Sequence, residues 1–88
     1  MEGQSKLAAL IDLAEQVGIT IRRVPSAGES AEHPGGALVR LKGKEVIFLD
    51  PTAPLGDQIA VVASALRGRS EVEGRFLPPE IRQAIEEG

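Results

Sequence analysis

The stretch ALVRLKGKEVIFL, residues 37–49, decides the fold, because it has the pattern of a two-stranded hairpin. Two apolar runs, 37–41 and 45–49, flank a Lys-Gly-Lys sequence. The glycine, Gly43, supplies the positive φ that a tight hairpin turn requires. The second run is apolar on both faces, which is typical of a strand that is central in its sheet or covered on both sides.

A helix and a strand are predicted ahead of the hairpin. Apolar residues recur at helical spacing over residues 6–17 and predict a helix there. Ser5 is expected to cap its start, and Gly18 is expected to end it in the left-handed conformation. Residues 19–24 alternate and are rich in β-branched side chains, so they predict a strand, which Pro25 ends.

The segments around the second half of the chain are less regular. Residues 25–36 hold Ser, Gly, Glu, His and two prolines without any period, and we expect a flexible surface loop. After the hairpin, Thr52 is expected to cap a helix, and Pro54 suits its first turn. The apolar spacing over 55–66 predicts that this helix is the most buried element.

The C-terminal segment is predicted to be a polar loop followed by a short helix. Residues 68–74 are mostly polar and charged, as in a loop. A Leu-Pro-Pro-Glu sequence then opens a helix of about residues 79–86. Leu77, just before this helix, is expected to form a hydrophobic staple with Ile81 inside it.

Together these elements predict one α+β domain over residues 1–88, with two layers. We expect a three-stranded, mostly antiparallel sheet packed by two to three helices, with the first two helices on one face. The core is expected to be aliphatic, because Phe48 and Phe76 are the only aromatic residues. The first strand carries Arg22 and Arg23, which would discourage edge pairing. The alternative is that one edge does pair and gives a homodimer.

Composition excludes several classes of function. The chain has no cysteine, which excludes disulfides, thiolate chemistry and sulfur-based zinc sites. The net charge of −3 attracts neither nucleic acid nor an anionic membrane, so we expect no membrane contact and consider nucleic acid an improbable partner. With no apolar stretch long enough for a membrane span, the expected location is the cytoplasm.

Two segments carry a resemblance to a known family. Residues 13–23 resemble the opening helix and strand of ImmA/IrrE-like zinc-peptidase domains, and residues 42–51 resemble the strand before their catalytic helix. The likeness covers residues 7–67. The family's next helix carries His-Glu-x-x-His, but residues 55–66 here contain neither His nor Glu. The resemblance therefore implies no zinc ligand, no cofactor and no catalytic residue in this chain.

The whole chain also looks like short bacterial proteins that share three sequence patterns. These are Gly35-Gly36, the Leu-Lys-Gly-Lys of residues 41–44 and the Leu-Pro-Pro-Glu of residues 77–80. The resemblance attaches no activity to them.

The clearest charge asymmetry is basic. Five residues lie on the predicted strands and their turn, where they could contact an anion or an acidic partner, or simply be solvated: Arg22, Arg23, Arg40, Lys42 and Lys44. No aromatic residue is interleaved with them, so stacking of single-stranded RNA bases is not expected.

Other candidates are weaker. Glu29, Glu32 and His33 could offer metal ligands, but they lie in the predicted loop rather than on a rigid frame. Gly35-Gly36 could approach a phosphate, although a turn with unusual φ fits its position better. Asp50 follows a strand, and a turn or capping role before a proline is favoured over catalysis.

Two functions therefore stay open. The first is a non-catalytic interaction or dimerisation module, supported by the missing chemistry, the basic sheet edge and an apolar surface around Phe76 and Leu77. The second is a degenerate enzyme scaffold that binds a small anionic ligand near the basic strands.

Overall fold

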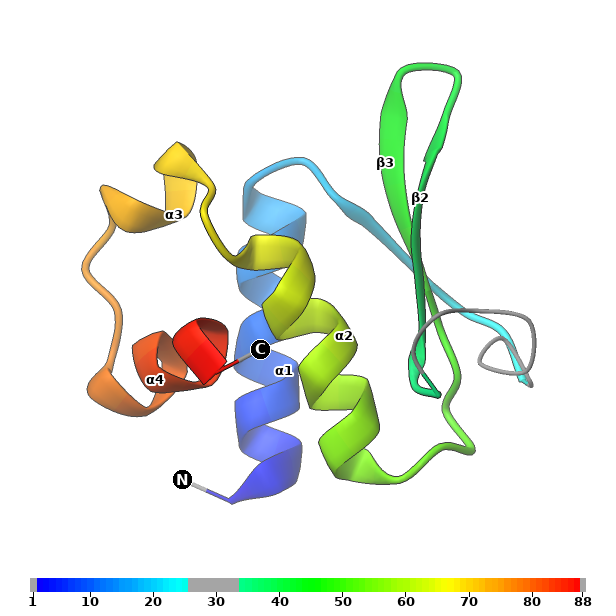
Figure 1. The fold of residues 1–88 in the computed structure, drawn as a ribbon, viewed down its shortest axis with the longest axis horizontal. Helices are drawn as coiled ribbons and strands as arrows, with labels where there is room; N and C mark the ends of the chain where they lie inside the picture. The colour runs from blue at the N-terminus through cyan, green and yellow to red at the C-terminus, as the bar shows by residue number, and fades with distance from the viewer. Residues whose placement is uncertain (1, 26–33, 88) are drawn as a thin grey trace.

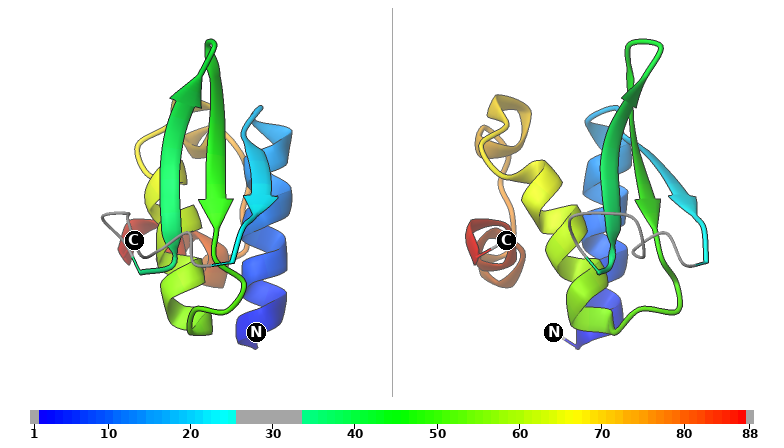
Figure 2. Two further views of the ribbon diagram at one scale, coloured as in Figure 1. Left: turned by 90° about the vertical axis from the view of Figure 1, so that its right-hand side faces the viewer. Right: turned by 45° about the vertical axis from the view of Figure 1, so that its right-hand side comes forward.

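A three-stranded sheet and a layer of helices form the two halves of the molecule (Figure 1). The computed structural model describes residues 2–25 and 34–87. The predicted α+β class is confirmed, with helices on one face of the sheet (Figure 2). The elements in chain order are α1 (Gly3–Gln16), β1 (Thr20–Arg23), β2 (Gly36–Leu41), β3 (Lys44–Leu49), α2 (Leu55–Leu66), α3 (Ser70–Glu73) and α4 (Pro79–Glu87).

The strand order is β1-β3-β2, so the strand that is apolar on both faces is central, as predicted. β2 and β3 form the antiparallel hairpin, whereas β1 runs parallel to β3 with Ile21 opposite Ile47. The sheet is therefore mixed, where a mostly antiparallel one was expected. The register places the partly buried Ile21 beside the fully buried Ile47, on the face toward the helices. Alternation in the sequence fixes the face of β1 but not its direction.

The turn end of the hairpin, residues 41–44, has the predicted tight turn. Lys42 and Gly43 both have positive φ, 51° and 79°. Positive φ at both central residues is the mark of a type I′ turn, whose twist matches that of the two paired strands.

The open end of the hairpin, opposite the turn, comprises Gly35, Gly36 and Asp50. The Asp50 amide donates to the Gly35 carbonyl at 2.8 Å. Gly36 has φ 146°, as expected of a turn with unusual φ. A Cβ atom on Gly36 would lie 2.0 Å from the Phe48 carbonyl oxygen, and one on Gly35 would lie 2.2 Å from that of Asp57. The backbone is therefore packed directly against β3 and α2.

α1 begins earlier than predicted. Its N-cap is Glu2, whose side chain makes no capping hydrogen bond, and Ser5 lies inside the helix, so the expected Ser5 cap is wrong. The first turn packs against α2, since a Cβ on Gly3 would lie 2.5 Å from Leu55. At the other end Gly18 has φ 94°, and the Ile19 amide donates to the Ala14 carbonyl at 2.9 Å, as expected of a helix end.

The core is aliphatic, as predicted. Phe48 is only partly buried, and Phe76 is exposed. α2 packs between α1, α4 and the sheet and has more buried residues than any other helix. The largest fully buried side chains are Leu10, Ile19, Ile47, Leu49, Val62 and Leu66.

The turn before α2 differs from the expected cap. The N-cap of α2 is Pro54, so the predicted cap by Thr52 is wrong. The Thr52 amide and hydroxyl instead donate to Asp50 Oδ1, at 2.9 and 2.6 Å. Asp50 therefore has the turn role that its position before Pro51 suggested.

A short helix interrupts the segment predicted as a loop at 68–74. α3 is a single turn whose only buried residue is Val72, 2% exposed, so one apolar residue among polar ones gave no period to detect. α4 forms as predicted, with Ile81 and Ile85 buried. Among the described residues, no helix is both long enough and apolar enough to cross a bilayer.

Candidate interaction surfaces

Charge is divided between the two layers of the molecule. The strands and the hairpin turn, residues 20–23 and 36–49, hold five basic residues and one acidic residue. The four helices hold two basic and eight acidic residues. The net negative charge of the chain therefore conceals a basic sheet beside an acidic helical layer.

Three of the five predicted contact residues lie on the edge strands of the sheet, and Lys42 and Lys44 lie in and directly after the hairpin turn. β3 separates β1 from β2, so Arg22 and Arg23 lie across the sheet from Arg40. Successive side chains of a strand point to opposite faces. Arg23, in register with the buried Leu49, faces the helices, whereas Arg22 shares the outer face with its partner Phe48.

These five side chains do not converge on one point. On the outer face, Lys44 is four residues along β3 from the Phe48–Arg22 pair, which corresponds to roughly 13 Å. Arg23 lines a cavity of about 310 Å³ together with Gln4 and Leu55. The geometry is that of an extended surface rather than a pocket for one anion, and contact through these residues stays a prediction.

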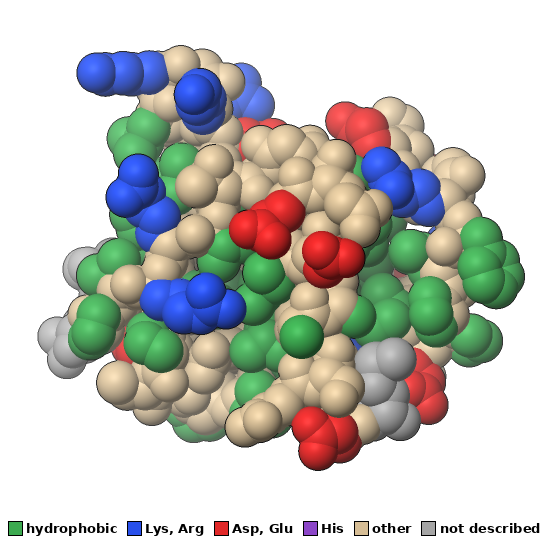
Figure 3. Space-filling model, turned by 180° about the vertical axis from the view of Figure 1, so that it is seen from behind, with side chains coloured by type: hydrophobic (Ala, Val, Ile, Leu, Met, Phe, Trp, Pro, Cys, Tyr) green, Lys and Arg blue, Asp and Glu red, His purple; other side chains and the backbone are tan. Residues whose placement is uncertain are grey.

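The turn end of the hairpin concentrates the exposed charge. Arg40, Lys42 and Lys44 are all exposed there, and Leu41 between them is 50% exposed. This end extends beyond the helical layer (Figures 1 and 2). Viewed from behind, Lys and Arg side chains gather on the side of the hairpin, while hydrophobic side chains gather at the opposite side, around the connection between α3 and α4 (Figure 3).

The one acidic residue of the sheet is neutralised from the helical layer. Arg69 Nη1 donates to Glu45 Oε1 at 2.8 Å, and its Nη2 donates to Oε2. The Arg69 Nε atom donates to the Ala65 carbonyl at the end of α2, at 2.6 Å. Arg69 is also the N-cap residue of α3. One side chain thus ties β3 to α2 at the start of α3.

The electrostatics of Glu45 follow from this pairing. The hydrogen bonds from Arg69 lower the pKa of the Glu45 carboxyl, and the positive charges of Arg69 and Arg40 act in the same direction. Partial burial opposes them. Because Glu45 is held as a carboxylate against Arg69, the sheet presents its remaining charge, which is positive, to solvent.

Nothing in the sequence pointed to this pair. Glu45 and Arg69 are 24 positions apart, and Arg69 lies in the segment predicted as a loop. Arg69 directly precedes the single turn of α3, which the sequence did not indicate.

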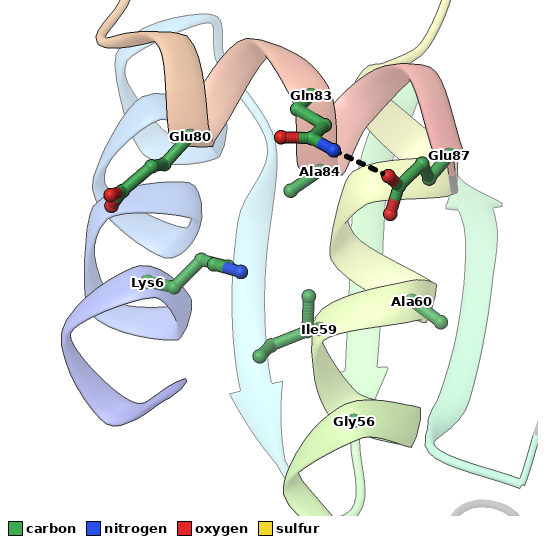
Figure 4. Close-up of a pocket in the computed structure, with 8 residues that line it drawn as sticks. All are labelled: Lys6, Gly56, Ile59, Ala60, Glu80, Gln83, Ala84 and Glu87. Atoms are coloured by element: carbon green, nitrogen blue, oxygen red, sulfur yellow. Dashed lines mark hydrogen bonds between the residues drawn. The ribbon is translucent and has the colours of Figure 1, made fainter. Parts of the chain in front are cut away.

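A groove of about 340 Å³ lies between α1, α2 and α4 (Figure 4). Lys6 enters from α1, and Glu80, Gln83 and Glu87 enter from α4, with Gln83 Nε2 donating to Glu87 Oε2 at 3.0 Å. Gly56 forms part of its α2 wall. No serine, cysteine or histidine is among its lining residues.

A second hollow lies beside the exposed aromatic residue. It measures about 400 Å³, and we call it the Phe76 recess. Phe76 is 93% exposed at its rim, in agreement with the apolar surface that the sequence indicated there. The apolar lining comes from α1, from the connection into α4 and from α4 itself, and comprises Ala9, Leu13, Leu77, Pro78 and Ile81.

The candidate metal ligands Glu29, Glu32 and His33 lie outside the described residues. Within residues 2–25 and 34–87, no group of three or more His, Cys, Asp or Glu side chains is placed to hold a metal ion. The space at Gly35 is filled by the Asp57 carbonyl oxygen, an acceptor, so this position contacts backbone rather than a phosphate.

Comparison of the chain with protein-family models, curated proteins and solved structures gives no match. The resemblances to zinc-peptidase domains and to short bacterial proteins therefore stay predictions. α2, where the peptidase motif would lie, buries Val61, Val62 and Leu66 in the core.

Proposed function

We propose that this protein is a non-catalytic interaction module that binds an acidic protein segment along the basic sheet, centred on the turn end of the hairpin. The observation that carries the proposal is the division of charge between the two layers. A basic surface attracts an acidic partner, and the acidic helical layer would repel the same partner, so binding is directed to one side.

The dimensions of the molecule allow the two charged regions to act separately. Its longest dimension is 33 Å. The Debye length at 0.1 M salt is about 10 Å, so the hairpin turn and the α3–α4 end are largely screened from each other. Since Glu45 is matched by Arg69, a partner at the hairpin meets Arg40, Lys42 and Lys44.

The exposed apolar residues favour a protein segment over a nucleic acid. Leu38 and Leu41 on β2 are 42% and 50% exposed. Leu38 lies on the helix-facing side, two residues from Arg40, and Leu41 lies on the outer face opposite Lys44. A phosphate backbone would use the charges and leave these leucines in water, whereas an acidic segment with apolar residues would use both.

Fluorescence anisotropy with a labelled probe tests the proposal. The probe is a Glu-rich peptide with interspersed leucines, compared with a Glu-rich peptide without leucine and with an oligouridylate of equal charge. We expect the leucine-containing peptide to bind most tightly, with affinity that falls as salt rises.

A pair of matched variants places the contact. Lys42→Glu is expected to weaken peptide binding by about tenfold, while Lys6→Glu, the same change on the helical layer, leaves it unchanged. Binding that is tighter for the oligouridylate, or equal loss in both variants, would overturn the proposal.

Two related expectations are tested separately. Binding of a small anion would appear as a thermal shift with inorganic phosphate, although the five basic residues surround no common cavity. A cytoplasmic location stays a prediction, to be checked by fractionation of the cells that express the protein.

A further inference from the structure

Phe76 is presented to solvent on a braced segment. The Arg75 amide donates to the Val72 carbonyl at 3.1 Å, and Arg82 Nη2 donates to the Arg75 carbonyl at 2.8 Å. Pro78 and Pro79 restrict the backbone that follows. A single exposed hydrophobic residue needs no explanation, but here a braced aromatic side chain stands at the rim of an apolar hollow.

A row of three polar residues crosses the same patch. Arg75 Nη1 donates to Gln16 Oε1 at 2.8 Å, and Gln16 Nε2 donates to Asp12 Oδ2 at 3.0 Å. All three line the Phe76 recess. The row runs from a positive end through a neutral centre to a negative end, so a half-turn about Gln16 exchanges its charges.

The apolar features follow the same symmetry. Phe76 is adjacent to Arg75 at the positive end of the row. Ala9 and Leu13 lie on α1 beside Asp12 at the negative end, and both line the recess. A half-turn about Gln16 therefore carries the Phe76 ring of one copy toward Ala9 and Leu13 of another.

We propose that this patch is a self-complementary interface, and that its occupant is a second copy of this chain related by a two-fold axis near Gln16. Each Phe76 enters the recess of the other copy, and each Arg75 faces the other copy's Asp12. A two-fold interface requires one patch to complement itself, which both the row and the recess satisfy.

The size of the patch sets the expected strength. A buried aromatic side chain covers roughly 150–250 Å², so two of them fall well below the roughly 1,600 Å² of a standard interface. The dimer is therefore expected to be weak, with a Kd on the order of 100 μM.

Sedimentation equilibrium of the full chain from micromolar to millimolar concentration tests the inference. Phe76→Ser is expected to raise the dimer Kd at least about tenfold, because the aromatic anchor is lost. Leu41→Ser, a matched change at an exposed apolar residue on the hairpin, leaves the Kd unchanged. Phe76 is almost fully exposed, so its variant keeps the fold.

Charge reversal gives a second, independent test. Asp12→Arg alone places two guanidinium groups against each other at each contact, and Arg75→Glu alone places two carboxylates there, so each variant should be monomeric. An equimolar mixture of the two variants has one contact between the two introduced side chains and one between the native Arg75 and Asp12. Both contacts then join opposite charges, and the mixture should form a heterodimer with a Kd within about threefold of the wild-type dimer.

The inference is overturned by a wild-type chain that stays monomeric at millimolar concentration, by Phe76→Ser without effect, or by a mixture of the charge variants that stays monomeric. Failure here is distinguishable from failure of the proposed function, because Phe76→Ser should leave binding of the acidic peptide intact.

Discussion

The open end and the turn end of the hairpin both depend on a glycine with positive φ, but for different reasons. Around Gly36, backbone atoms of β3 occupy the space that a side chain would need. Around Gly43, no atom lies within 4 Å of an added Cβ, and only the φ of 79° matters. One end is fixed by packing against its neighbours, and the other by local backbone conformation.

Gly36→Ala should have the largest effect, because it breaks the packed end. The new Cβ meets the Phe48 carbonyl, and φ 146° is a strained conformation for alanine. Backbone strain and overpacking each cost about 1–3 kcal/mol, so we expect a loss of about 2–6 kcal/mol in the free energy of unfolding. Urea denaturation measures it.

Two other glycine variants control this comparison. Gly35→Ala meets the Asp57 carbonyl at 2.2 Å and should also be strongly destabilising. Gly56→Ala, in the first turn of α2, meets nothing within 4 Å and should leave stability unchanged or slightly raised. If Gly36→Ala proved as mild as Gly56→Ala, the open end would not be fixed by packing.

Arg69→Met should have an intermediate effect. It removes both hydrogen bonds to Glu45 and the bond to the Ala65 carbonyl, while keeping the apolar stem. Side chains of this pair are 19% and 25% exposed, and we expect a loss of about 1–2 kcal/mol in unfolding free energy. A loss as large as that of Gly36→Ala would mean that contact with the helical layer, rather than packing at the open end, holds the hairpin in place.

The same pair predicts a pH dependence. The pKa of Glu45 is lowered in the folded protein by the hydrogen bonds from Arg69. Its contribution is thus fully present above the unfolded-state pKa of about 4.3 and is lost as pH falls through the lower folded-state value. The stability difference between wild type and Glu45→Gln should therefore shrink on acidification below a pH of about 4.3, and an unchanged difference would contradict this account.

Gly43→Ala should have the smallest effect. Only the left-handed conformation opposes the substitution, at about 1 kcal/mol, because the added methyl group meets no neighbour. Gly43→Asn should cost less, since asparagine tolerates this conformation. A cost well above that of Arg69→Met would show a packing constraint at the turn end as well.

Local signals explain which parts of the fold could be predicted. The hairpin followed from Gly43 between two apolar runs, and the end of α1 followed from Gly18. The predicted caps at Ser5 and Thr52 were wrong because residue type alone does not place the start of a helix. A hydroxyl caps a helix only where the helix begins at that residue. α1 begins before Ser5, where its first turn contacts Leu55. The Thr52 hydroxyl donates to Asp50 Oδ1 instead of capping α2.

The surfaces were predictable as composition but not as geometry. The basic residues were identified, yet their distribution over the two edges of the sheet depends on strand order, which alternation does not encode. Exposure of Phe76 was anticipated, whereas the recess beside it needs α1 and the connection into α4 to meet. The pair of Glu45 and Arg69 joins distant segments that no short-range pattern relates.

The parallel pairing of β1 with β3 has a consequence for the order of folding. Ile21 pairs with Ile47 across a long stretch of chain, whereas the hairpin pairs begin at Leu41 and Lys44. Closing the shorter loop costs less chain entropy, so the hairpin can form first and β1 can dock last. Amide hydrogens of β1 should then exchange with solvent through an opening in which the hairpin stays intact.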